Sequence, residues 1–429
     1  MTSPDVSKRL ASDMRRKLKV ALVGVGGYGS IYASALLNRG NRSGVSLVAG
    51  VDAIVGQHTE SLVSKGVSIY SSMEEMYKCH QPDLTVIASP IQHHFQQVLA
   101  ALQHDSHVLC EKPVSATVEQ AIEMRRVQEM TGKTVAIGYQ WSFCPVIQKL
   151  KRDIAAGELG RPKRFRTLVL WPRSEDYYQR NGWSGRELDK RGEAVFDSPA
   201  NNACAHFLHN MLFVLGDSPN TSSQVSEVRA ELYRANNISS YDTVALRCCT
   251  VDDVELQFIA SHATAGSFGP HFTYEFENAT ILYADQPGAS LIAHFHDGST
   301  KTYGKPAHAN DPSKLWETIR CLREGSSVSC DIETALPHAQ VVAAARTSSG
   351  KIHDFPVQLR EKRTENIGVT TVVNGLGEQL FRCYEEGKLP SELQYAWAVH
   401  SKSVKLNSHT NLHLSLNANL RPMHRHIFS

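Results

Sequence analysis

The chain has no apolar run that approaches the roughly 20 residues needed to span a bilayer, which argues against a membrane-spanning helix. Its nine cysteines form no C-x-x-C pair, so neither a zinc knuckle nor a disulfide framework is expected. Charge of one sign is not in excess, because 45 Lys and Arg stand against 43 Asp and Glu. That balance argues against a nucleic-acid partner or a polybasic membrane surface. We therefore expect a cytoplasmic protein with reduced thiols and no secretory signal in its first 17 residues.

The first half of the chain alternates short apolar runs with helical stretches. With 429 residues and a hydrophobic content of 41%, the chain is long enough for two domains. The apolar runs are residues 18–25, 46–51, 84–88, 107–110 and 134–137, and amphipathic stretches lie between them at 28–37, 73–78, 92–103 and 118–130. This alternation predicts an α/β Rossmann domain with a doubly wound parallel sheet over residues 18–142.

The pattern changes after residue 142. Strand-like runs now follow one another at 165–170, 227–234, 243–248, 254–260 and 272–276, with helical patterns at 146–156, 312–323, 332–345 and 375–386. They predict a second domain of α+β type with a mainly antiparallel sheet over residues 143–405. Residues 1–17 read as a polar extension, and residues 406–429 as a C-terminal tail or arm. In that arm Leu412 to Leu420 alternate with polar residues, which suits either a half-buried strand or a loosely ordered tail.

A glycine-rich turn follows the first buried run. Gly24-Val25-Gly26-Gly27-Tyr28-Gly29 matches G-x-G-x-x-G between a strand and a helix, which is the context of a dinucleotide site. Its glycines permit the tight turn, the approach of a pyrophosphate and the packing of the helix on the strand. A tight turn without a ligand is the alternative interpretation.

The choice of dinucleotide depends on Asp52, which ends the next strand. A carboxylate there binds ribose hydroxyls and repels a 2′-phosphate. Ala53 and Ile54 follow, so no basic residue stands directly beyond Asp52 to receive that phosphate. The sequence thus favours NAD, while Arg42 or another cation leaves NADP possible.

Four further motifs carry a resemblance to a known family. In chain order they are Ala88-Ser89-Pro90 followed by His94, Cys110-Glu111-Lys112-Pro113, Gly138-Tyr139-Gln140, and Leu150-Lys151 through Gly157-Glu158-Leu159-Gly160-Arg161-Pro162. With the glycine turn they resemble the Gfo/Idh/MocA family, the glucose-fructose oxidoreductase and inositol dehydrogenase group. The resemblance is clear from about Lys19 to Gly216 and fainter beyond.

The resemblance implies a fold, an activity and a set of cofactor contacts. It implies a Rossmann domain plus a domain with an open-faced sheet, homodimers or homotetramers built through that sheet, and hydride transfer on sugars, cyclitols or related polyols. The residues expected at the cofactor are Gly24, Gly26, Gly27, Tyr28, Gly29, Asp52, Ser89, Pro90, His94, Glu111, Lys112 and Gln140.

Hydride transfer from an alcohol needs a base for the hydroxyl proton and a positive group for the developing alkoxide. Lys112 follows a parallel strand and suits the second role. The segment from Asn202 to His209 resembles the family's D-x-G-x-H-x-x-D, which makes His206 the expected base. Asn202 and His209 depart from the two Asp of that pattern, so we expect Asn202 to orient and His209 to relay protons or bind substrate.

The spacing of Asn202, His206 and His209 predicts one helical face, at i, i+4 and i+7. No third ligand joins the two histidines, so no metal is predicted. The expected substrate contacts are Lys112, Tyr139, Trp183, Asp197, His206 and His209, in part from an aromatic and charged stretch between Trp171 and Asn202 that suits a sugar. Core packing explains some of these aromatic and histidine side chains equally well. Ser142 also differs from the family's pattern, because many relatives carry Arg at this position.

Two other functions stay open beside an NAD(P)-dependent dehydrogenase. One is a glycosidase of the same family that uses NAD without net redox change. The other is a non-catalytic protein that senses a sugar or dinucleotide, an alternative kept open by the changes at Asn202 and His209. The sequence leaves the polyol, the reacting carbon, the direction and the subunit count undetermined.

Overall fold

The computed structural model describes residues 17–54, 56–308 and 310–406. Nearly all of the polar extension and of the C-terminal arm expected from the sequence therefore lie outside the described residues. Within the described ranges, no helix is long and apolar enough to cross a membrane.

The N-terminal domain is built on a parallel sheet in the order β3-β2-β1-β4-β5-β6. The strands are β1 (Leu18–Val23), β2 (Val45–Val51), β3 (Ser68–Tyr70), β4 (Leu84–Ile87), β5 (His107–Cys110) and β6 (Val135–Ile137). This is the strand order of a Rossmann fold, which reverses between β1 and β4. Ligands bind such sheets at the carboxyl ends of the strands at this point, where the glycine turn leaves β1.

Helices cover both faces of this sheet, which confirms the predicted doubly wound domain. They are α2 (Gly29–Arg39), α3 (Gln57–Val63), α4 (Met73–Cys79), α5 (Ile91–Gln103) and α6 (Val118–Thr131). Val20 to Val23 and Leu84 to Ile87 are at most 2% exposed because each strand lies between two helical layers. The short turn η2 (Gln140–Phe143) then leads out of the domain.

The second domain holds a mixed, mainly antiparallel sheet, as predicted. Its order is β14-β13-β12-β11-β7-β10-β9-β8-β15, with β18 also on β8. The strands are β7 (Pro162–Leu170), β8 (Val225–Arg234), β9 (Thr243–Thr250), β10 (Glu255–Ser261), β11 (Phe268–Phe276), β12 (Ala279–Ala284), β13 (Leu291–Phe295), β14 (Thr300–Gly304), β15 (His353–Asp354) and β18 (Val404–Lys405). Only the pairs β7–β10 and β8–β15 are parallel among the described strands of this sheet.

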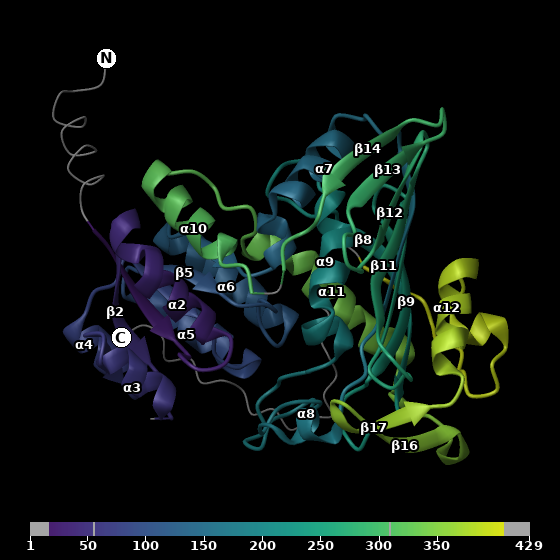
Figure 1. Cartoon of the computed structure of the whole chain (residues 1–429), viewed down its shortest axis with the longest axis horizontal. Helices are drawn as coiled ribbons and strands as arrows, with labels where there is room; N and C mark the ends of the chain where they lie inside the picture. The colour runs from purple at the N-terminus through teal and green to yellow at the C-terminus, as the bar shows by residue number, and fades with distance from the viewer. Residues whose placement is uncertain (1–16, 55, 309, 407–429) are drawn as a thin grey trace.

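The inner face of this sheet packs on helices and faces the Rossmann domain (Figure 1). These helices are α7 (Pro145–Ala155), α9 (Ala205–Val214) and α11 (Ile332–Ser349). Two short elements, α8 (Glu175–Gln179) and the π turn η3 (Pro199–Ala203), lie in the segment between β7 and α9. That segment carries several of the predicted site residues.

The outer face of the sheet is partly covered, unlike the open face that the resemblance implied. On this side lie α12 (Leu376–Glu386), η5 (Pro390–Leu393) and, after η4 (Val357–Leu359), the hairpin β16 (Arg360–Glu365) and β17 (Gly368–Val373). Leu380, Tyr384 and Trp397 pack there in a core with Leu168 and Ile259. The strands toward the β14 edge are less covered on this face, as the 41% exposure of Leu282 in β12 shows.

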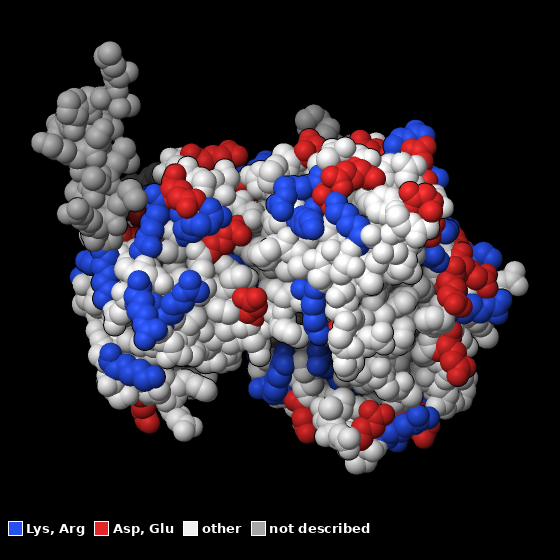
Figure 2. All heavy atoms as spheres, turned by 45° about the horizontal axis from the view of Figure 1, so that its top comes forward, with Lys and Arg blue, Asp and Glu red and all other residues white. Residues whose placement is uncertain are grey.

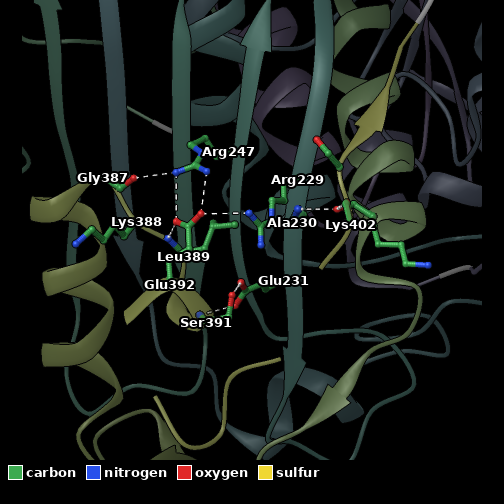
Figure 3. Close-up of polar contacts among 12 residues, drawn as sticks. Arg229, Ala230, Glu231, Arg247, Gly387, Lys388, Leu389, Ser391, Glu392 and Lys402 are labelled. Atoms are coloured by element: carbon green, nitrogen blue, oxygen red, sulfur yellow. Dashed lines mark hydrogen bonds and ion pairs between the residues drawn. The ribbon is translucent and has the colours of Figure 1, made fainter. Parts of the chain in front are cut away.

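A polar network fastens this cover to the sheet (Figure 3). The Glu392 carboxylate of η5 accepts hydrogen bonds from Arg247 of β9 at 2.9 and 3.2 Å and from Arg229 of β8 at 3.3 Å. Beside it, Ser391 donates its hydroxyl to the buried Glu231 at 2.5 Å and its backbone N–H at 3.2 Å. The carboxylates of Glu392 and Glu231 thus both accept hydrogen bonds where the cover meets the sheet, and charge-assisted hydrogen bonds are strong. The C-terminal segment is therefore an integral part of the domain.

The chain returns to the Rossmann domain after β14. Helix α10 (Ser313–Glu324) buries Leu315 and Ile319 in the Rossmann core, and the start of α11 adds Ile332 and Leu336. A segment far from the first 142 residues in sequence thus completes the N-terminal domain. This return brings Lys314 to the end of β5.

Candidate active site

A cleft of about 1810 Å³ lies where the two domains meet. Its walls include the glycine turn, the ends of β2, β4 and β5, the segment after β7, the π turn and the start of α9. Sites for one drug-sized ligand measure roughly 300–1,000 Å³. The cleft therefore has room for a dinucleotide and a second ligand.

The glycine turn has the geometry of a phosphate cradle. Gly24 has φ +79°, and a Cβ on it would lie 2.9 Å from the backbone of Ala88 and Ser89. A Cβ on Gly29 would lie 1.8 Å from the Gly24 carbonyl oxygen, so this position requires glycine. Gly26 and Gly27 line the cleft; a Cβ at Gly27 would enter open space, and one at Gly26 would only make an ordinary contact with the His58 ring at 3.8 Å. Two glycines therefore close the strand–helix turn, and two leave the backbone open to a ligand.

Asp52 lies beside this turn, as predicted. Its carboxylate accepts hydrogen bonds at 3.0 Å from the backbone N–H groups of Val25 and Ile54, and it lines the cleft. The two bonds fix its position at the carboxyl end of β2. From there it can accept hydrogen bonds from ribose hydroxyls.

Unpartnered polar atoms support a ligand in the cleft. Gln140 Nε2, Gln92 Oε1 and His206 Nδ1 are buried and have no hydrogen-bond partner within the described residues. All three residues line the cleft. Buried polar groups are rarely left unsatisfied, so these atoms, with the open glycine turn, fit a bound dinucleotide and substrate.

The end of β5 carries a buried ion pair. Lys314 Nζ lies 2.5 Å from Glu111 Oε1, and the two side chains are 1% and 10% exposed. Tyr32 donates its hydroxyl to the same carboxylate, and Lys112 N–H donates to Glu111 Oε2 at 3.3 Å. Lys314 also lies over the Tyr28 ring, 4.4 Å from its centroid. Glu111 is thus held by protein groups, and it positions the backbone of Lys112.

Lys112 spans the two domains. Its Nζ donates to the backbone carbonyl and to the side-chain oxygen of Asn202, each at 2.8 Å. Asn202 in turn donates Nδ2 to Asp197 at 2.7 Å, and Asp197 also accepts from Gly185 N–H at 2.6 Å. Burial lowers the pKa of Lys112 to about 8, partly opposed by the nearby Glu111 carboxylate. The ammonium is therefore fixed in the cleft wall and readily loses its proton.

His206 lines the cleft, while His209 does not. Burial and the charge of Lys112 hold the pKa of His206 well below its usual range, so its imidazole is neutral at pH 7. His209 is fully buried, stacks on Tyr139 with ring centroids 3.9 Å apart, and bonds Ser142 Oγ through Nε2 at 3.0 Å. It therefore packs behind the wall, and the geometry does not support the expected substrate contact.

The helical face expected for Asn202, His206 and His209 is also corrected. Asn202 belongs to the π turn η3, which Ser198 caps by accepting from Asn201 N–H, and α9 begins only at Ala205. The non-helical backbone at Cys204, with φ −109° and ψ 10°, separates the two elements. Asn202 nevertheless reaches the cleft, because the π turn directs it at Lys112.

Three other predicted contacts lie behind the wall. Tyr139 is fully buried and hydrogen-bonds His338 Nδ1 at 2.8 Å. Asp197, 3% exposed, positions Asn202 as described above. His94 bonds the carbonyls of Pro113 at 2.9 Å and Ser89 at 3.0 Å, joining the loops after β5 and β4. These residues support the site through their neighbours instead of touching a ligand.

The remaining predicted residues line the cleft. Tyr28, Ser89, Pro90 and Gln140 stand on the dinucleotide side, and Trp183 on the substrate side. Among the described residues, no group of three His, Cys, Asp or Glu could hold a metal ion. The sequence also did not identify several lining residues, such as Phe207, Tyr283, Asp285, Lys305 and His308. No local motif marks them, because they reach the cleft only through the packing of the sheet.

Fold and site together define a Rossmann dinucleotide-binding domain joined to an α+β domain. Residues 18–139 match the model of an oxidoreductase family with an NAD-binding Rossmann fold, GFO_IDH_MocA. The Rossmann domain of this chain is thus similar to that of the Gfo/Idh/MocA oxidoreductase family, the family that the motifs resemble.

Curated relatives match less than half of the chain. The chain is 28% identical over 202 residues to the D-glucoside 3-dehydrogenase of Escherichia coli, covering 46% of this chain and 54% of that protein. It is 33% identical over 148 residues to the inositol 2-dehydrogenase of Mycolicibacterium smegmatis, covering 34% and 42%. The matched part thus spans about half the length of these relatives.

Solved structures resemble the chain over both domains. The WlbA dehydrogenase of Bordetella pertussis, crystallised with NADH and UDP-GlcNAcA, superposes with a TM-score of 0.66 at 21% identity and covers 78% of this chain and 97% of that one. An oxidoreductase of Agrobacterium radiobacter in complex with NAD+, L-tartaric acid and magnesium gives 0.63 at 18% identity, covering 78% and 96%. At these identities the likeness establishes the fold.

Proposed function

We propose that the protein is an NAD-dependent oxidoreductase that transfers a hydride between the nicotinamide and a sugar, cyclitol or related polyol. The observation that carries the proposal is one continuous cleft that two sets of residues line. Gly26, Gly27 and Asp52 suit a dinucleotide, and Lys112 and His206 suit the chemistry on a hydroxyl. The named dehydrogenases among the relatives support this class of reaction.

The glycine turn, Asp52 and Gln140 would hold the dinucleotide. When bound, NAD supplies the hydride acceptor for the carbon that bears the reacting hydroxyl. Asp52 would accept hydrogen bonds from the ribose hydroxyls, and the backbone N–H groups at the N-terminus of α2 would stabilise the pyrophosphate charge. Lys112 and His206 then act on the hydroxyl that is oxidised.

Lys112 stabilises the developing negative charge. Two of its three N–H groups are committed to Asn202, so the third can donate to the substrate oxygen. The fixed position of the ammonium means that little reorganisation is needed as charge develops.

His206 accepts the hydroxyl proton. Its imidazole is neutral at pH 7, and its Nδ1 has no partner within the described residues. Asn202 adds no charge beside it and orients Lys112 instead. This division of roles accommodates an Asn at position 202.

The test combines dinucleotide binding with turnover. We expect purified protein to bind NAD more tightly than NADP and to form NADH with a polyol from a panel of sugars and cyclitols. Lys112→Met and His206→Ala should each lower kcat by about 10²–10⁴-fold while leaving NAD binding largely intact. Lys65→Ala, an exposed site outside the cleft, is the matched control.

Three results would contradict the proposal. Absence of dinucleotide binding removes its basis, and near-normal turnover of Lys112→Met removes the assigned site. Release of a sugar from a glycoside without net NADH, with tightly retained NAD, would identify the redox-neutral glycosidase instead. The predicted subunit assembly and cytoplasmic location are separate proposals, which size-exclusion chromatography with light scattering and cell fractionation test.

A further inference from the structure

The substrate side of the cleft gathers positive charge. Beside Lys112, five lining side chains are cations without an ion-pair partner in the described part of the chain: Arg173, Arg180, Lys190, Arg191 and Lys305. The whole chain has a formal net charge of only +2. The excess is therefore local to the cleft.

The acidic residues of the cleft do not balance these cations. Asp52 accepts bonds from the glycine turn, and Glu111 is paired with Lys314. Asp189 accepts hydrogen bonds from the backbone of its own loop, and Asp285 accepts one from the Tyr283 hydroxyl. Each carboxylate keeps its negative charge, but these four lining carboxylates stand against six lining cations, which are Lys112 and the five named above.

Arg173 and Arg180 share one aromatic platform. Their Cζ atoms lie 4.7 and 3.8 Å from the centroid of the Tyr177 ring. Arg180 Nε also donates to Ser184 Oγ at 3.0 Å, whereas Arg173 Nε is buried without a partner. Both guanidinium groups are thus held against one ring, and neither has an ion-pair partner in the described part of the chain. An anionic ligand in the cleft would supply the missing negative charge.

This arginine pair lies close to Lys112. Burial raises the pKa of the Cys204 thiol, and the charges of Arg173 and Lys112 both oppose that rise. The charges of Arg180 and Lys112 act in the same way on the pKa of the buried Asp197 carboxyl. Asp197 forms no ion pair with either arginine or with Lys112 in the described part of the chain, and its two oxygens accept hydrogen bonds from Gly185 and Asn202. Arg173, Arg180 and Lys112 all line the same cleft.

We propose that the substrate carries an anionic group, a carboxylate or a phosphate, and that Arg173 and Arg180, both held against the Tyr177 ring, bind it in the cleft that Lys112 also lines. The inference rests on the proposed function and narrows its substrate class to acidic or phosphorylated sugars. A guanidinium presents two parallel N–H donors that match both anions. The Tyr177 ring restricts the two arginines and lowers the entropy lost on binding.

The other three cations suit a role in attraction. Lys190, Arg191 and Lys305 are exposed, and they line the same cleft. On the face drawn in Figure 2, Lys and Arg side chains gather along the hollow between the two parts of the molecule. Such a field raises the rate at which an anion enters a cleft and weakens as the ionic strength rises.

The test uses matched sugars and the protein saturated with NADH. Calorimetric titration compares D-glucose with D-glucuronate and D-glucose 6-phosphate, and D-galactose with D-galacturonate and D-galactose 1-phosphate. At least one anionic sugar should bind about 10–100-fold more tightly than its neutral partner. The uronate and phosphate arms distinguish the two anionic groups.

Variants assign the effect to the arginine pair. Arg173→Met and Arg180→Met should each remove most of the preference and leave the affinity for the neutral sugar unchanged. Arg180 is exposed, so its variant is expected to fold even if Arg173→Met does not. Arg152→Met removes one exposed charge of α7 outside the cleft and should keep the preference.

The outcomes separate this inference from the proposed function. Equal binding within every pair, no binding of any anionic sugar, or a preference that survives both arginine variants overturns the inference. Lys112-dependent oxidation of a neutral polyol in that case leaves the proposed function standing. Arginine-dependent binding of an anionic sugar without any NADH formation supports the anion site and contradicts the dehydrogenase.

Discussion

The buried ion pair between Lys314 and Glu111 provides a strong test of how α10 is held on the Rossmann sheet. Lys314→Met removes the ammonium and keeps a side chain of similar length. Within the described residues, Glu111 then retains only the Tyr32 hydroxyl and the Lys112 N–H as hydrogen-bond donors. Its carboxylate has little access to solvent, because the Glu111 side chain is only 10% exposed.

Removing one partner of a buried ion pair typically costs about 3–5 kcal/mol, because the other charge remains uncompensated. The remaining donors solvate Glu111 in part, so we expect about 3 kcal/mol for Lys314→Met. Glu111→Gln leaves Lys314 with the Gly138 carbonyl at 3.3 Å and the Tyr28 ring, and we expect a similar loss. The double variant buries no unpaired charge. Its loss in free energy of unfolding should therefore be about 2 kcal/mol smaller than the sum of the two single losses.

Urea unfolding followed by tryptophan fluorescence and far-UV circular dichroism measures these free energies. Lys78→Met, which breaks the exposed pair with Glu74, is the matched control and should leave the transition unchanged. Strict additivity of Lys314→Met and Glu111→Gln would refute the reasoning, since it would mean that the two charges do not stabilise each other.

Three further predictions concern protonation and cofactor choice. With Lys112 as the positive group, kcat/KM for oxidation should fall as pH rises through about 8, where its ammonium loses its proton; a rise in the pH–rate profile would make Lys112 the base. Burial lowers the pKa of His262 to about 3 and of His338 to about 4, so at pH 5 both stay neutral when folded but take up protons when unfolded. Stability should therefore fall by about 2 kcal/mol for each between pH 8 and 5, seen as a lower urea midpoint. Asp52→Ala should weaken NAD binding and bring the NAD and NADP dissociation constants closer together, and an unchanged ratio would reject its ribose role.

The residues that the sequence placed well are those at strand ends. Gly24 to Gly29, Asp52 and Lys112 follow buried strands, and parallel strands bring their carboxyl ends to one edge of a sheet. Their position thus depends only on the strand order, which the apolar runs and their spacing indicate. The sequence did not predict the strands β3 and β12 to β14, because they are short or mix polar with apolar residues. Their pairing depends on neighbouring strands more than on local pattern.

The residues placed less well depend on backbone detail or on distant packing. The spacing of Asn202 and His209 implied one continuous helix, but a π turn and a break at Cys204 intervene, and His209 packs behind the wall. No periodicity distinguishes a π turn from an α-helix over five residues. Lys314 is 203 positions from Glu111 in the sequence, so only the return of α10 reveals the pair.

Two neighbouring residues at the end of β5 are thus each tied to a segment far along the chain. Glu111 is held by Lys314 of α10, which packs on the Rossmann core, and Lys112 is held by Asn202 of the π turn, four residues before His206. A hinge motion that separated the domains would break both hydrogen bonds of the Lys112 ammonium to Asn202, and hydrogen bonds to charged groups contribute roughly 1.5–3 kcal/mol each. We therefore expect the distance between Lys112 and His206 to be nearly the same with and without ligand. Catalytic groups held in this way are preorganised for charge development, so binding energy need not be spent on assembling them.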